Sequence, residues 1–115
     1  MPAPRLSAKM WTAAYIRRCQ TMAVPAMVVH HGDDTAGVVL LKINTLVDGC
    51  AVYQPATDMD GNRYWRVGTG EALVSESDAD AFIDRQRGYD RDLWVIEVED
   101  REGRHFLEEP VRKDG

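Results

Sequence analysis

PAMVVHHGDDTAGVVLLKINTLVDGCAVYQPATDMDGNRYWRV, residues 25–67, is the stretch that decides the fold of this 115-residue chain. It contains short runs rich in β-branched and aromatic residues, which predict four strands at residues 26–31, 37–46, 50–55 and 63–67. The segments between these runs contain residues typical of tight antiparallel hairpins: Gly32-Asp33, Asp48-Gly49 and Asp60-Gly61. We therefore expect an antiparallel meander.

Two helices are predicted around this stretch. Residues 7–22 lack Gly and Pro, and Ser7 stands where an N-cap is needed. At about 100° per residue, one apolar stripe of this helix consists of Trp11, Ala14, Tyr15, Cys19 and Met22. Arg18 falls within the same stripe. The second helix begins near Ser75 and ends near Gly88, with one apolar side made of Ala79, Phe82, Ile83 and Gln86.

A fifth strand follows the second helix. In residues 93–99, one face of the strand carries Trp94, Ile96 and Val98 and the other carries Val95, Glu97 and Glu99. This alternation is typical of a strand with one buried face. Residues 104–107 are a candidate for one more strand. The order helix, four strands, helix, strand predicts an α+β fold, in which an antiparallel sheet of about five strands carries both helices on one face.

Length and composition indicate one domain over residues 1–115, with an ordered core at about 6–107 and a frayed tail at 108–115. The net charge of −5 repels phosphate backbones and disfavours nucleic acid as a partner. No apolar run reaches the length of a membrane span or a signal peptide, so we expect a cytoplasmic protein that does not bind a membrane. Cys19 and Cys50 lack metal-binding spacing and are predicted to be buried free thiols; no metal or cofactor is expected.

Three segments of the chain share features with a known family: Trp11 through Ile16-Arg17-Arg18; Gly32-Asp33 with Ala36-Gly37-Val38; and Asp90-x-Asp92-Leu93-Trp94-Val95 through Glu97-x-Glu99-Asp100 to Gly103-Arg104-x-Phe106. Over about residues 6–107 the chain resembles the alphaproteobacterial domain-of-unknown-function family number fourteen ninety-one. The resemblance implies a small single-domain cytosolic protein. It implies no activity, cofactor or catalytic residue.

Arg18 is the first candidate binding residue, because it lies on an apolar stripe. An unpaired buried guanidinium costs several kcal/mol, so we expect a carboxylate partner. The candidates for this partner are Asp90, Asp92 and Glu97. With Arg17, Arg18 is also a candidate for binding a small anion.

Trp65 and Arg66 are further candidates, because aromatic residues beside arginines on an exposed sheet face can form a stacking platform for bases. An uncovered apolar sheet face also usually marks an association surface. The leading hypothesis is a non-enzymatic interaction module that forms a homodimer or binds a protein partner through that face or through the edge of strand 93–99. One alternative is a small hydrolase or nuclease-like enzyme that uses the acidic cluster from Asp90 to Asp100 with Arg18. The other is a small-anion binder at Arg17, Arg18 and Arg66.

Overall fold

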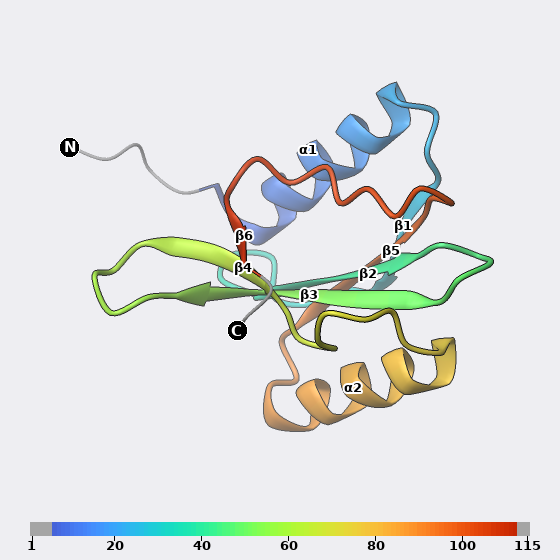
Figure 1. The fold of residues 1–115 in the computed structure, drawn as a ribbon. Coiled ribbons are helices and arrows are strands. Elements are labelled where there is room, and N and C mark those ends of the chain that lie inside the picture. Colours follow the sequence, from blue (N-terminus) through green and yellow to red (C-terminus); the bar gives the residue numbers. More distant parts are fainter. Residues whose placement is uncertain (1–5, 113–115) are drawn as a thin grey trace.

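The computed structural model describes residues 6–112, and Figure 1 shows how its helices and strands are arranged. The elements are α1 (Ala8–Thr21), β1 (Ala26–His30), β2 (Val39–Asn44), β3 (Cys50–Thr57), β4 (Arg63–Val67), α2 (Glu76–Tyr89), β5 (Trp94–Glu99) and β6 (Val111–Arg112). Ser7 caps the first helix, as predicted, and Ser75 caps the second, near which its start was predicted. The order along the chain differs from the predicted one by the additional strand β6.

All the strands belong to one mixed sheet with the order β1-β5-β2-β3-β4-β6. β2, β3 and β4 pair antiparallel in chain order, as their turn residues predict. The prediction of a purely antiparallel sheet is wrong, because β5 lies between β1 and β2, antiparallel to β1 and parallel to β2. Parallel neighbours need a long crossover connection, and the chain from β2 through β3, β4 and α2 provides it before β5. β5 is therefore an interior strand and not the edge that the sequence suggested.

The two helices cover opposite faces of the sheet, as Figure 1 shows. The prediction that both pack on one face is wrong, and β2 explains why. All residues of β2 are buried; Val39, Leu41 and Ile43 belong to the core beside α1, whereas Leu40 belongs to the core beside α2. A strand that is apolar on both faces needs cover on both. Each face therefore carries a helix, in place of the uncovered face that was predicted.

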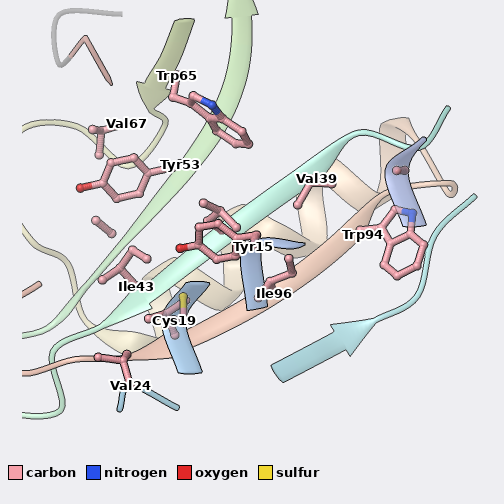
Figure 2. Packing of buried hydrophobic residues seen from close by; sticks show 14 residues of the cluster. Tyr15, Cys19, Val24, Val39, Ile43, Tyr53, Trp65, Val67, Trp94 and Ile96 are labelled. Atoms are coloured by element: carbon pink, nitrogen blue, oxygen red, sulfur yellow. The ribbon is translucent and has the colours of Figure 1, made fainter. Parts of the chain in front are cut away.

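Tyr15 and Cys19 join α1 to the sheet, and both are fully buried. Figure 2 shows them among side chains of β2, β3 and β5. Ala14 and Met22, two predicted members of the apolar stripe, are exposed instead. The buried line of α1 consists of Ala8, Thr12, Tyr15 and Cys19. No helix within residues 6–112 is long and apolar enough to cross a membrane.

The end of the chain also differs from the prediction. Residues 104–107 form no strand, because Arg104 turns back onto Asp100 and donates from Nε to its Oδ2 at 3.0 Å. Residues 111–112, predicted to be frayed, form β6 and pair in parallel with β4. The last part of the predicted tail, residues 113–115, lies outside the described residues.

Replacing Tyr15 with phenylalanine is expected to lower the free energy of unfolding by about 1–2 kcal/mol. The Tyr15 hydroxyl donates to the backbone carbonyl of His105 at 2.7 Å, and the variant leaves that part-buried acceptor without its partner. Tyr53→Phe is the matched control, because the buried Tyr53 makes no side-chain hydrogen bond within residues 6–112. Urea unfolding measures both variants, and equal stabilities would contradict a contribution from the Tyr15 bond.

Candidate functional site

β1 forms one edge of the sheet, with β5 as its neighbour on the inner side. Its apolar residues Met27, Val28 and Val29 are 48%, 40% and 58% exposed. No charged residue stands among residues 26–29. Natural edge strands are usually protected by charged residues, proline or bulges, because an open apolar edge invites another strand. In β1 the register shifts between Val28 and His30, so such protection is confined to the end of the strand.

The backbone of β1 has hydrogen-bonding groups that point away from the sheet. Glu99 N donates to Pro25 O at 3.0 Å, and the register places Met27 opposite Glu97. Hydrogen-bonded and non-hydrogen-bonded pairs alternate along an antiparallel ladder. Ala26 and Val28 therefore direct their N–H and C=O groups outward, where an added strand can pair with them.

Lys42 lies in the middle of β2 on the side that faces α2, and its side chain is only 5% exposed. Its Nζ donates to Glu76 Oε2 and Asp80 Oδ1, both at 2.8 Å, and lies 3.5 Å from Glu97 Oε1. Burial by itself lowers the pKa of a lysine. The hydrogen bonds to Asp80 and Glu76 and the charge of Glu97 outweigh burial, so the pKa of Lys42 is raised above its usual value. Lys42 is therefore a buried cation that holds three carboxylates.

A groove of about 430 Å³ adjoins this ion cluster and extends to β1. The sheet contributes Lys42, Val95 and Glu97, and β1 contributes Val29 and His30. One face of α2 contributes residues three or four positions apart, namely Glu76, Asp80, Ile83, Asp84 and Arg87. Four carboxylates and two cations line the groove, which leaves two negative charges in excess when His30 is neutral. We call this hollow the acidic groove.

Sequence reasoning missed Lys42, although a signal for it exists. Lys42 interrupts the run VVLLKIN, which is otherwise apolar up to Ile43. A lysine is almost never fully buried unless it is paired. A charged residue inside a run that predicts a strand buried on both faces therefore indicates a partner of opposite charge across the core.

Arg17 and Arg18, two of the predicted binding residues, lie on α1, far from this groove in the fold. Arg17 is exposed. Arg18 donates from Nη1 to Phe106 O at 2.6 Å, and its Nη2 lies 3.1 Å from Glu108 Oε1. The expected carboxylate partner is present, but its predicted origin in Asp90, Asp92 or Glu97 is wrong. The reason is that the C-terminal segment returns over α1.

Trp65 and Arg66, the next predicted pair, point to opposite faces of the sheet because they are neighbours on β4. Trp65 is buried, stacks on Trp11 with 5.6 Å between ring centroids, and donates from Nε1 to Glu109 Oε1 at 3.2 Å. Arg66 lies opposite Gln54 on β3, and its buried Nε has no hydrogen-bond partner within residues 6–112. Trp65 is thus a core residue in this fold, and Arg66 lies on the other side.

The three predicted acidic residues do not form one cluster. Asp90 is the C-cap of α2, where its Oδ1 accepts a hydrogen bond from Asp92 N at 2.9 Å. Asp92 is exposed in the loop before β5. Only Glu97 lies in the acidic groove. The binding roles of Arg17, Arg18, Trp65, Arg66, Asp90, Asp92 and Glu97 stay predictions.

Comparisons with known proteins identify relatives of the chain. Residues 6–108 match the family model described as "Protein of unknown function (DUF1491)". A crystal structure of a DUF1491 family protein from Caulobacter crescentus is similar, with 41% identity, a TM-score of 0.85, and coverage of 94% of this chain and 100% of that one. An NMR structure of a DUF1491 family protein from the same organism has 40% identity, a TM-score of 0.83, and coverage of 96% and 99%.

A protein from A. tumefaciens, solved in solution, is a more distant relative. It shares 28% identity and a TM-score of 0.71, over 84% of this chain and 86% of that one. The search of curated proteins gives no match.

Proposed function

This chain belongs to the DUF1491 family of proteins of unknown function, as its sequence resemblance predicted, and we propose that it is a non-enzymatic interaction module acting in the cytoplasm. In this proposal a partner protein adds an extended segment to β1 as a further strand. The observation that carries the proposal is the exposed apolar edge made by Met27, Val28 and Val29. Strand addition obtains affinity from main-chain hydrogen bonds and specificity from side-chain pockets, and β1 offers outward N–H and C=O groups beside the acidic groove.

A partner of different sequence suits this edge better than a second copy of the chain. Each chain carries a net charge of −5, so two copies repel each other at distance. A two-fold pairing of β1 with its own copy also brings two acidic grooves toward each other. Like charges close together across paired strands are destabilising.

Two serines and both cysteines have structural roles or are buried, which supports a function without catalysis. Ser7 and Ser75 accept the hydrogen bonds of the N-caps. Cys19 and Cys50 are buried free thiols, as predicted, and burial raises the pKa of each. A thiol with a raised pKa forms little reactive thiolate near neutral pH.

The two alternative functions need residues that lie on different sides of the sheet. Arg18 contacts the C-terminal segment beside α1, whereas Glu97 lies in the acidic groove beside α2. Arg66 likewise lies on the face opposite to Trp65 and α1. The separation of these residues gives less support to the hydrolase site with Arg18 and to the anion site at Arg17, Arg18 and Arg66 than to the interaction module.

Val28→Pro is expected to weaken the binding of strand-forming peptides at least about tenfold. Proline lacks an N–H, and the N–H of Val28 points outward, so the variant blocks an added strand while the ladder with β5 stays intact. The measurement is selection of displayed random peptides on the native protein, followed by titration of the enriched peptides against each variant. Val28→Thr, which keeps the N–H and the branched shape, is the matched control.

Enriched peptides that bind Val28→Pro and the native protein equally, or a library without any enriched peptide, would overturn the proposal. If Val28→Pro does not fold, Val28→Lys places a charge on the same edge and repeats the test. Light scattering tests whether β1 binds a second copy of the chain instead. A dimer mass that returns to the monomer mass in Val28→Pro would show that β1 binds a second copy, which contradicts a partner of different sequence.

A further inference from the structure

We infer that the segment added to β1 carries a basic side chain, arginine or lysine, which enters the acidic groove between β1 and α2. This inference rests on the proposed function and specifies the chemistry of the partner. It combines the open edge of β1, the position of the groove directly beside that edge, and the negative charge of its lining.

The geometry determines which side chains of an added strand can reach the groove. Directly paired residues of neighbouring strands share a face, so Met27 lies on the same side of the sheet as Glu97. Alternate side chains of a strand paired with β1 project to that side as well. Strands lie about 4.8 Å apart, so only a long side chain crosses β1 to reach the groove. Lysine and arginine do this well, because their apolar stems can pack on Met27 and Val29 while the charged ends reach the carboxylates.

The charges of the groove favour a cation over a neutral or acidic side chain. Lys42 is already held by Glu76, Asp80 and Glu97, so the protein's own buried cation is fully occupied. Asp84 is exposed, lines the groove, and makes no side-chain hydrogen bond or ion pair within residues 6–112. Asp84 lies about two helical turns from Glu76 on the same face of α2, so its free carboxylate lies beside the ion cluster of Lys42. A basic side chain from the partner therefore meets the carboxylate of Asp84 first, with those of Asp80 and Glu97 nearby in the groove.

Two displayed peptide libraries test the inference. Both contain random strand-forming peptides and differ only at one fixed central position, which is arginine in the first library and glutamine in the second. We expect the arginine library to be enriched on the native protein at least about tenfold over the glutamine library, because a hydrogen bond between charged groups is stronger than one between neutral groups. The preference should fall below about twofold on the double variant D84N/E97Q.

The matched control is Asp78→Asn, which removes the same charge from an exposed residue of α2 outside the groove. It should leave the preference for arginine unchanged. Asp84→Asn alone provides a second test that does not touch the Lys42 cluster, and a reduced preference is expected there too. Equal enrichment of both libraries that still depends on Val28 would overturn this inference and leave the proposed function standing. Enrichment of neither library would overturn the proposed function itself.

Discussion

Lys42→Met is expected to lower the free energy of unfolding at pH 7 by about 2–3 kcal/mol. Methionine fills a similar volume, but it leaves Glu76, Asp80 and Glu97 close together without a cation. Removing one partner of a buried ion pair usually costs about 3–5 kcal/mol. The side chains of Glu76 and Asp80 are 56% and 54% exposed, and solvent screening places the expected loss below that range.

Urea unfolding at pH 7 measures this effect. Lys9→Met, at an exposed position of α1, is the matched control and should change stability by less than about 0.5 kcal/mol. A Lys42→Met variant as stable as the native protein at pH 7 would show that the ion cluster contributes no net stability.

The free energy of unfolding is expected to fall steeply as the pH rises above about 9. The pKa values of Cys19, Cys50 and Tyr15 are all raised by burial, and that of Lys42 is raised by its carboxylate partners against burial. In each case the folded protein keeps a proton that the unfolded chain loses. Their stabilisation is complete below the unfolded-state pKa and is lost as the pH rises toward the higher folded-state pKa.

The expected slope is about 1.4 kcal/mol per pH unit for each group that stays protonated only in the folded state. A series of urea unfolding measurements from pH 8 to pH 11, in steps of about one pH unit, determines this slope. Tyr15→Phe removes one titrating group, so its slope should be smaller at the alkaline end than that of the native protein. A stability that stays constant over this range would contradict the raised pKa values.

The helices illustrate what sequence reasoning predicts well. Ser7 was identified as a cap, the start of the second helix was placed near Ser75, and Ala79 and Ile83 were assigned to its apolar side. The structure bears out each of these. Caps and helical spacing act over a few residues, so they can be recognised locally. The same holds for the hairpin turns between β2, β3 and β4.

The acidic groove illustrates what could not be predicted. Lys42 and Asp80 are separated by 38 positions in the chain and meet only because α2 lies on the face of the sheet opposite to α1. Glu97 was predicted as a binding residue and was one of three candidate partners of Arg18, but Arg18 lies on the other side of the sheet. An error in the placement of one helix therefore paired the wrong charges.

By itself, the sequence determined the α+β class, the helices and the main strands, the cap at Ser7, the turns that join β2, β3 and β4, and the family. Each of these depends on residue types at short spacing. Only the tertiary structure decided the insertion of β5 between β1 and β2, the cover of both sheet faces, and the apolar edge at Met27, Val28 and Val29 beside the acidic groove. These features depend on which distant segments pack together, and the burial of β2 on both faces settles that packing.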